Sequence, residues 1–398
     1  MSSGDDLLNR VQTRTWATVR LDAVAHNVRV LRGCVPSRTA FMAVVKADAY
    51  GHGAVPVARA AIGAGASWLG VATPDEALAL RAAGIDARVL VLGPVAPAFV
   101  RDVVAAGCAL TVADPASLEA AHQAGGATPV RVHLKVDTGM ARLGVAPEDV
   151  GALLPRIDGA RVIVEGVFTH LACADDHDPT ITRAQLAAFG RAADAVARRF
   201  PGVIRHAAAS AAVVGHREAA LDLVRVGISL YGIPAAPHLR QVDLRPVMTL
   251  ASRVVRLRRV ARDTPVSYGA TYRTPADTVI ATVPVGYADG YPRALGNRGV
   301  MLVRGQRVPV AGRVCMDYTM LDTGGVALAE GDEVEVFGDG LPVWEVADTA
   351  GTIAYELLCR IGPRVPRVYT RDGRAVAVTL GTLRDIDAST AARAAGSR

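Results

Sequence analysis

An alternation of two kinds of segment from Thr39 onward constrains the fold of this chain more than any other feature. Short runs rich in β-branched residues alternate with alanine-rich amphipathic stretches, such as 75–83 and 181–200, and this alternation is typical of repeated β–α units. The candidate strands end near Lys46, Thr73, Gly93, Ala113, Asp137, His170, Ser210 and Gly227. Eight parallel strands with outer helices form a closed barrel, with its active site at the C-terminal ends of the strands. The sequence therefore predicts an α/β fold built on a TIM-type (β/α)8 barrel.

The pattern changes after about Val247, where strand-like runs are divided by Gly and Asp turns. These runs are 278–285, 300–303, 332–337 and 374–380, and they accompany one good helix, 343–358. The sequence therefore predicts a barrel over 15–246 followed by a mainly β domain over 247–385, which the length of 398 residues allows. The early run 16–21 also has strand composition and could pair with the β domain instead of with the barrel.

Charge and cysteine content argue against several classes of protein. The formal net charge of +6 comes from arginines scattered along the chain, so the sequence predicts no nucleic-acid partner. The five cysteines form no CxxC pair, which argues against a disulfide framework and a zinc site, and we predict no metal. Residues 1–14 contain no long apolar run, so we expect a cytoplasmic protein without a secretory signal or membrane span. We expect disordered tails at 1–14 and 386–398.

Lysine is rare in this chain. It occurs only at Lys46 and Lys135, so 42 of the 44 basic residues are arginine. A lysine amine can lose its proton and act as a nucleophile, whereas a guanidinium does not, because their reference pKa values are about 10.4 and more than 12. Both lysines are therefore candidates for amine chemistry.

Polar residues close several of the predicted barrel strands. They are Lys46, Lys135, Asp137, His170, Ser210 and Arg225. Lys46 ends a buried strand and precedes a turn that contains Tyr50 and two glycines. An apolar setting favours the neutral amine, which imine formation requires, although a structural lysine at a barrel mouth would show the same spacing.

The segment around Lys46, VVKADAYGHG, resembles the cofactor-lysine signature of the alanine racemases. Further blocks follow in the order of that family: HLKVDTGMARLG, GVFTHLACADD, VRVGISLYG, VSYGATY, PVGYADGYPR, GRVCMD and AYELLCRIGPRVPR. The resemblance implies an enzyme that interconverts L-alanine and D-alanine with pyridoxal 5'-phosphate. It also implies a homodimer in which the β domain of one subunit closes the barrel site of the other. The proton transfer would use two bases on opposite faces of the cofactor imine, Lys46 and the partner-supplied Tyr268.

The resemblance also implies a set of cofactor-binding residues. They are Lys46, Tyr50, Arg142, His170, Ser210, Arg225, Gly227, Ile228 and Tyr355. Arg225 resembles the arginine that faces the pyridine nitrogen of the cofactor. A guanidinium keeps its protons, so the pyridine would stay unprotonated and accept less charge. His170 resembles the histidine that links Tyr268 towards Arg225.

The substrate-binding residues implied by the resemblance are Arg142, Met316, Asp317 and Tyr287. Asp175, Arg293 and Arg313 resemble residues further out along the entry corridor. Lys135 resembles a lysine that some members of the family carry as a carbamate beside Arg142. Either a modified Lys135 or a bound anion would remove the repulsion between these two cations, and both interpretations remain open.

Two departures from the family pattern leave the substrate open. Ala209 stands where the family often has Asn, and Tyr318 stands where a smaller or amide side chain is expected. These residues leave open a racemase of serine or of another small amino acid. A barrel-type amino-acid decarboxylase would place a carboxylate at the pyridine nitrogen, so Arg225 argues against it. A non-catalytic pyridoxal-phosphate carrier would lack the second domain and its Tyr268.

Overall fold

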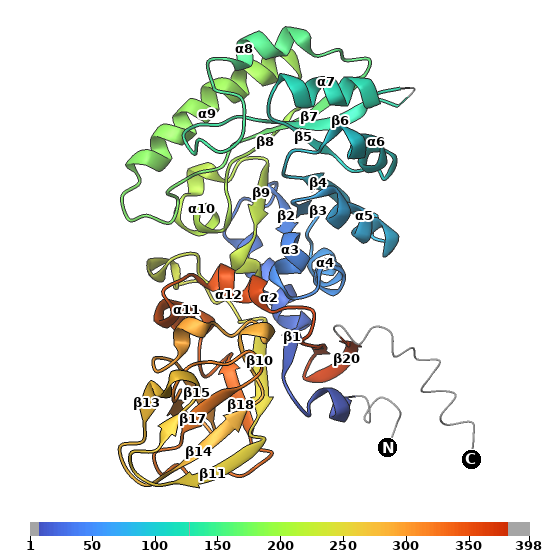
Figure 1. The fold of residues 1–398 in the computed structure, drawn as a ribbon. Coiled ribbons are helices and arrows are strands. Elements are labelled where there is room, and N and C mark those ends of the chain that lie inside the picture. Colours follow the sequence, from blue (N-terminus) through green and yellow to red (C-terminus); the bar gives the residue numbers. More distant parts are fainter. Residues whose placement is uncertain (1–7, 127, 381–398) are drawn as a thin grey trace, which may run out of the picture. The chain divides into compact units, whose positions relative to one another are not determined.

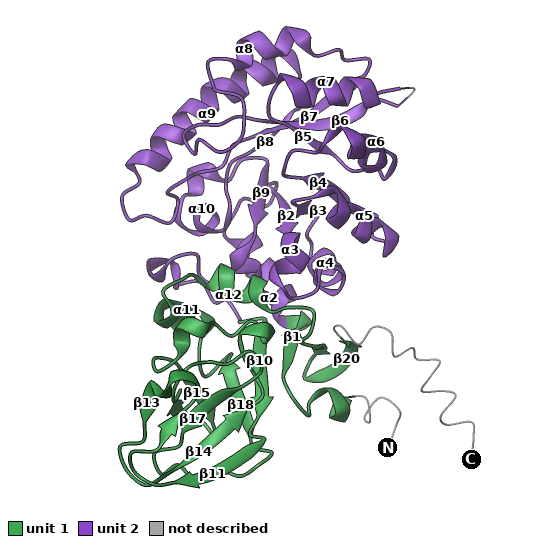
Figure 2. Cartoon of the chain, viewed as in Figure 1, with its two compact units in different colours: residues 1–22, 246–398 green, residues 23–245 purple. Residues whose placement is uncertain are grey.

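The computed structural model describes residues 8–126 and 128–380 (Figure 1). The chain divides into two compact units, one of residues 23–245 and one of residues 1–22 together with 246–398 (Figure 2). Within the described residues, no helix is both long and apolar enough to cross a membrane.

The unit of residues 23–245 contains eight parallel strands. They are β2 (Ala40–Val44), β3 (Trp68–Val71), β4 (Arg88–Val91), β5 (Leu110–Val112), β6 (Val130–Lys135), β7 (Val162–Phe168), β8 (Ile204–His206) and β9 (Leu223–Val226). They pair in the orders β4-β3-β2-β9 and β5-β6-β7-β8. A parallel bridge between Leu90 and Ala109 joins β4 to the start of β5, and the Arg225 N–H donates to the Ala208 carbonyl at 2.9 Å beyond β8. The predicted (β/α)8 barrel is confirmed.

The helices of this unit alternate with the strands (Figure 1). They are α2 (Leu21–Gly33), α3 (Lys46–Tyr50), α4 (Ala54–Gly63), α5 (Pro74–Ala82), α6 (Pro97–Ala105), α7 (Pro115–Ala124), α8 (Val150–Leu153), α9 (Thr180–Arg199) and α10 (Ser210–Gly215). Proline opens α5, α6 and α7, where its missing N–H has no helical partner to lose. Thr73 and Asp114 cap α5 and α7 through capping boxes. Local sequence therefore sets where these helices begin, and the polar loops before them form the barrel mouth.

The other unit is mainly β structure. Its larger sheet has the order β16-β15-β18-β10-β1-β19-β20, and a smaller sheet has the order β11-β14-β17. The strands are β1 (Trp16–Arg20), β10 (Met248–Arg253), β11 (Arg256–Val260), β12 (Pro265–Val266), β13 (Tyr272–Arg273), β14 (Thr278–Val283), β15 (Val300–Val303), β16 (Gln306–Pro309), β17 (Thr319–Asp322), β18 (Glu333–Phe337), β19 (Arg367–Arg371) and β20 (Arg374–Thr379). β1 pairs antiparallel with β10 and parallel with β19. The barrel unit therefore begins at residue 23 and not at residue 15.

Part of the predicted N-terminal tail is ordered. Leu8 and Val11 pack with Trp16, Ala251 and Val368 in one hydrophobic cluster. The prediction of a disordered tail over 1–14 is therefore wrong for residues 8–14, because the apolar side chains three residues apart reach a core. Residues 1–7 and 386–398 lie outside the described part of the chain.

The helix predicted over 343–358 is wrong, because two helices occupy this segment. α11 spans Val343–Ala350 and α12 spans Ala354–Arg360. Gly351 separates them with a φ of 76°, a left-handed conformation that commonly closes helices. The break places Tyr355 in the first turn of a separate helix.

Candidate active site

The barrel strands bring the predicted polar side chains to one end of the barrel. Lys46 begins α3 two residues after β2, and Lys135 is the last residue of β6. His170 follows β7 by two residues, and Ser210 begins α10 after β8. Arg225 differs from these, because it is the third residue of β9 and lies buried within the strand.

The chain after Lys46 makes a left-handed turn that the sequence did not predict. Ala47, Asp48, Ala49 and Tyr50 have φ values of 52°, 52°, 54° and 53°. Each non-glycine residue in this conformation costs roughly 1–2 kcal/mol. Strain of this kind persists only where surrounding contacts determine the backbone, and it is concentrated at functional sites.

Two carboxylates hold the left-handed turn in place. Glu76 Oε1 accepts the Ala47 N–H at 2.6 Å, while its Oε2 accepts the Ala72 N–H at 2.7 Å. Asp48 Oδ1 accepts the Ala54 N–H at 2.8 Å. Glu76 also belongs to the capping box of α5, which is the sequence signal that could have drawn attention to it. The turn directs the chain from Lys46 to the buried Tyr50.

Substitution of Ala47 tests the strain in this turn. Ala47 is exposed, so a change there removes no packing. We expect Ala47→Val to lower the melting temperature, because a β-branched residue is a genuine outlier at positive φ. Ala47→Gly is the matched control, and we expect it to keep or raise the melting temperature because glycine adopts this conformation without steric cost. Equal melting temperatures for the two variants would show that the turn is not strained.

Hydroxyls and backbone N–H groups converge at the start of α10. Ser210 Oγ accepts the N–H groups of Gly227 at 3.0 Å and of Ser229 at 3.3 Å. A Cβ built on Gly227 would lie 2.5 Å from the Tyr50 hydroxyl oxygen, so only glycine leaves this approach open. Ile228 lies buried between the two N–H donors, and the sequence had not singled out Ser229. The Ser210 and Tyr50 hydroxyls and the backbone at Gly227 therefore lie together, and such polar groups suit an anion such as a phosphate.

The buried Arg225 has only neutral hydrogen-bond partners. Its guanidinium donates to the Thr169 carbonyl at 2.7 Å, to the Ala207 carbonyl at 3.1 Å and to His206 Nδ1 at 3.0 Å. It also lies 3.4 Å from His170 Nδ1. Burial lowers the pKa of Arg225 to about 10, so the guanidinium remains charged at neutral pH. Among the described residues, no carboxylate forms an ion pair with Arg225.

The barrel mouth carries an excess of positive charge. Burial, with the nearby cations Arg142, Arg225 and Lys46, lowers the pKa of Lys135 to about 8. Burial and the same cations lower the pKa of His170 to about 3, so His170 is neutral at neutral pH. The site therefore favours an anionic ligand.

Asp137 shapes the loop that carries Arg142. Its carboxylate accepts the backbone N–H groups of Gly139, Met140 and Ala141 through Oδ1, and that of Arg142 through Oδ2. Burial would raise the pKa of Asp137, but these four hydrogen bonds together lower it. Asp137 is therefore a positioning residue for Arg142 that sequence reasoning had treated only as part of the rim.

In the β unit, three loops gather the remaining predicted side chains on one exposed surface. The Tyr287 N–H donates to the Cys315 carbonyl at 3.1 Å, and the Ser267 hydroxyl donates to the Arg313 carbonyl at 2.6 Å. The side chains presented by these loops are exposed although they are large and mostly apolar: Tyr268 (71%), Tyr287 (44%), Met316 (52%) and Tyr318 (48%). Tyr355 is exposed on α12 of the same unit.

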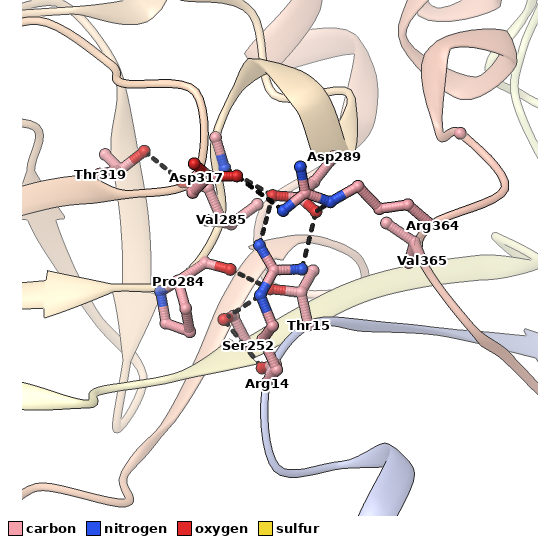
Figure 3. A network of polar contacts seen from close by, with 12 residues as sticks. Arg14, Thr15, Ser252, Pro284, Val285, Asp289, Asp317, Thr319, Arg364 and Val365 are labelled. Atoms are coloured by element: carbon pink, nitrogen blue, oxygen red, sulfur yellow. Dashed lines mark hydrogen bonds and ion pairs between the residues drawn. The ribbon is translucent and has the colours of Figure 1, made fainter. Parts of the chain in front are cut away.

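A charged network fixes two of these loops (Figure 3). The buried Asp289 pairs with Arg14 at 2.9 Å and with Arg364 at 3.2 Å, and its Oδ2 accepts the Gly286 N–H at 2.9 Å. Arg364 also donates to Asp317 Oδ1 at 2.7 Å. Sequence reasoning missed Arg14, Asp289 and Arg364, because only the fold brings them together. Asp317 was predicted, and the network now ties it to the loop that carries Tyr287.

The described residues contain no group of three or more His, Cys, Asp and Glu side chains that could hold a metal ion. The groups present suit a phosphorylated organic cofactor: the Ser210 and Tyr50 hydroxyls, a buried guanidinium and a lysine amine.

Comparison with known proteins identifies the family. Residues 19–235 match the alanine racemase N-terminal domain, and residues 247–369 match the alanine racemase C-terminal domain. Alanine racemase of Desulfosudis oleivorans is 48% identical over 377 residues, with 89% of this chain and 96% of that protein covered. The corresponding enzyme of Thermobifida fusca is 44% identical, with 89% and 97% covered.

Solved structures agree with this assignment. Alanine racemase from Bacillus anthracis with bound L-Ala-P superposes with a TM-score of 0.88 at 36% identity, covering 94% of this chain and 99% of that one. Alanine racemase from D-cycloserine-producing Streptomyces lavendulae gives a TM-score of 0.84 at 43% identity, covering 90% and 97%. Both domains of the family are present in their usual order, and the chain belongs to the alanine racemase family.

Proposed function

We propose that this chain interconverts L-alanine and D-alanine with pyridoxal 5'-phosphate bound at the barrel mouth. The observation that carries the proposal is the buried Arg225, which faces the same mouth as Lys46 without a carboxylate partner among the described residues. The relatives named alanine racemase and the structure with bound L-Ala-P support the same reaction.

The residues present fit pyridoxal phosphate. Lys46 would hold the cofactor through its amine, and Arg225 would face the pyridine nitrogen. Tyr50 and Ser210 would hold the phosphate with the backbone N–H groups of Gly227 and Ile228, as the family resemblance implies, and the closeness of Ser210, Gly227 and Tyr50 supports this assignment. Tyr355 would complete this set. The bound cofactor supplies an electron-withdrawing ring that acidifies the Cα–H bond of an amino acid.

The reaction itself needs two groups that exchange protons with Cα from opposite sides. We assign the Lys46 amine to one side and the Tyr268 hydroxyl to the other. His170 is neutral because burial and nearby cations lower its pKa to about 3. Its Nδ1 faces the Arg225 guanidinium, which only donates, so the ring carries its proton at Nε2 and can donate a hydrogen bond to the Tyr268 oxygen. Arg225 remains charged and does not donate its proton to the ring, which favours proton return to Cα over other outcomes.

Substrate binding would use groups of both units. Arg142 suits a carboxylate, because its guanidinium presents a fork of N–H donors and Asp137 fixes its loop. The backbone N–H of Met316, with Asp317 and Tyr287, would form the other wall. Lys135 beside Arg142 would carry a carbamate or face a bound anion, since either would neutralise the local charge.

We further propose a homodimer in which each β unit completes the partner's barrel site. The exposure of Tyr268, Tyr287 and Met316 supports this arrangement, because large side chains gathered on one surface often mark an interface. A shared site would make activity depend on assembly.

The first test is release of D-alanine from L-alanine by the purified protein with added pyridoxal phosphate. L-Serine is run in parallel, and Lys46→Ala is the blank. We expect turnover of alanine that the blank abolishes. Turnover of serine without alanine would identify a racemase of another small amino acid and direct attention to Ala209 and Tyr318. Absence of turnover on both would contradict the proposal.

A further inference from the structure

A line of buried polar side chains crosses the interior of the barrel from Arg225 to Glu165. Arg225 Nη1 lies 3.0 Å from His206 Nδ1, and His206 Nε2 lies 2.8 Å from His133 Nδ1. His133 Nε2 has no hydrogen-bond partner among the described residues, and it lies 3.5 Å from Glu165 Oε2, within ion-pair distance. Both histidines are completely buried, and the Glu165 side chain is only 7% exposed.

The chemistry of the donors fixes the direction of this line. A guanidinium only donates hydrogen bonds, so His206 must accept at Nδ1 and carry its proton at Nε2. His206 then donates to His133 Nδ1, so His133 in turn carries its proton at Nε2. That proton lies on the side of Glu165, whose carboxylate oxygen Oε2 is 3.5 Å from Nε2. Every hydrogen-bond donor in the line therefore points towards Glu165.

The charges at the two ends agree with this direction. Burial is the main cause that lowers the pKa values of His206 and His133, so both rings are neutral at neutral pH. Glu165 is held as a carboxylate at the opposite end of the strands, where it pairs with Arg88 and with Arg131 at 3.0 Å. Burial opposes its ionisation, but His133 and the two arginines lower the pKa of Glu165 overall.

The sequence makes space for this arrangement at Gly166. The pairing of β6 with β7 shifts register between Val132 and His133, and a Cβ on Gly166 would overlap the His133 ring. Glycine at position 166 therefore allows the His133 imidazole to lie inside the barrel, next to the carboxylate of Glu165.

We propose that Glu165 is a positioning residue: its carboxylate favours, from the other end of the line, the same tautomers of His133 and His206 that Arg225 requires, and it thereby helps to aim Arg225 at the cofactor ring. The role of Arg225 rests on the proposed function. The tautomers of His133 and His206 do not depend on that function, because they follow from the protein groups alone.

Removal of the Glu165 carboxylate should change the proton positions on both histidines of the line. In Glu165→Leu, the Nε2 proton of His133 loses the carboxylate that faces it, and the ring favours the tautomer with its proton at Nδ1. This proton faces His206 Nε2, so His206 must move its own proton to Nδ1, where it faces the guanidinium of Arg225. Two donors then oppose each other, and Arg225 loses one of the contacts that orient it.

The test is NMR of the full chain labelled with 15N at its nine histidines, with and without added pyridoxal phosphate. Ring signals are assigned with single histidine substitutions. In the unmodified protein we expect His206 and His133 to be neutral with protons at Nε2. A proton at Nδ1 of His206, or a protonated His133, would overturn the proposal without any change at Glu165.

Three variants extend the test. Glu165→Leu should move the His206 proton to Nδ1 and lower kcat about tenfold or more, with KM changed less than twofold. Glu165→Gln keeps an acceptor oxygen and should retain the original tautomers. Asp194→Asn, which removes an exposed ion pair with Arg205 in the same unit, is the control and should change neither quantity. Unchanged tautomers in Glu165→Leu would reject the proposal. If the tautomers shift in Glu165→Leu but the unmodified protein racemises no amino acid, the positioning role of Glu165 is supported and the proposed function is rejected.

Discussion

A mixed dimer of one Lys46→Ala subunit and one Tyr268→Phe subunit is expected to show about half of the unmodified activity, although neither variant alone is active. If Tyr268 serves the partner's barrel, one site of the mixed dimer contains both changes and the other contains neither. Two affinity tags allow the mixed dimer to be isolated, and D-alanine release measures its activity.

The single changes should each remove most turnover. Loss of one positioned acid or base group typically lowers a rate by about 10²–10⁴-fold. Racemisation needs both groups in every turnover, so Lys46→Ala and Tyr268→Phe should each reach at least this range. Residual activity of the two homodimers sets the background for the mixed dimer.

A control dimer distinguishes a shared site from a site within one subunit. It combines an unmodified subunit with a subunit that carries both Lys46→Ala and Tyr268→Phe. A shared site leaves neither centre of this dimer complete, so we expect almost no activity. If the control dimer shows half activity and the first mixed dimer shows none, Tyr268 acts on the Lys46 of its own subunit and the proposed arrangement is wrong.

Asp289→Asn is expected to lower the free energy of unfolding by about 2–4 kcal/mol, because it removes the buried partner of two arginines. Arg14 and Arg364 would each lose an ion pair, and the Gly286 N–H would lose a carboxylate acceptor. The loop that carries Tyr287 should loosen, so we also expect a higher KM for alanine. Chemical denaturation and steady-state kinetics measure the two effects.

Asp339→Asn is the matched control for this change. Asp339 also makes a two-oxygen pair with an arginine, Arg20, but its side chain is 59% exposed. Exposed pairs contribute about 0–1 kcal/mol, so the control should lose little stability and leave KM unchanged. Equal losses in the two variants would contradict a special role for the buried Asp289.

The barrel could be predicted from sequence because most of its strands are short apolar runs that lead to polar residues. β2 shows this clearly, since its five residues are apolar and Lys46 follows two residues after it. The family blocks also brought together the residues of the mouth, including Lys46 and Arg225. Such signals are local in the chain, so a single sequence preserves them.

The left-handed turn could not be predicted for a physical reason. Ala47 and Ala49 have no intrinsic preference for positive φ, and the conformation is imposed by contacts from Glu76 and Asp48. Other features also depend on contacts between residues that are far apart in the sequence, so the local sequence does not predict them. Arg14 and Asp289 are 275 residues apart, and nothing near either residue indicates its partner.

The break at Gly351 is a different kind of miss, because its signal was present. A glycine after eight helical residues is a common helix terminus, yet the apolar pattern on both sides suggested one continuous helix. At this position the glycine indicates a helix end more strongly than the apolar pattern indicates a continuous helix.

The position of β1 in its sheet affects how the chain folds as it is synthesised. β1 is made first, but its partners β10 and β19 lie at 248–253 and 367–371. The whole barrel, through Val226, leaves the ribosome before either partner does. Between Val226 and Arg371 the ribosome adds 145 residues, which takes roughly 7–30 s at typical rates of synthesis. Both edges of β1 are open until β10 emerges, and the edge that pairs with β19 stays open for the whole interval, so the nascent chain carries an unpaired strand edge that other chains could bind.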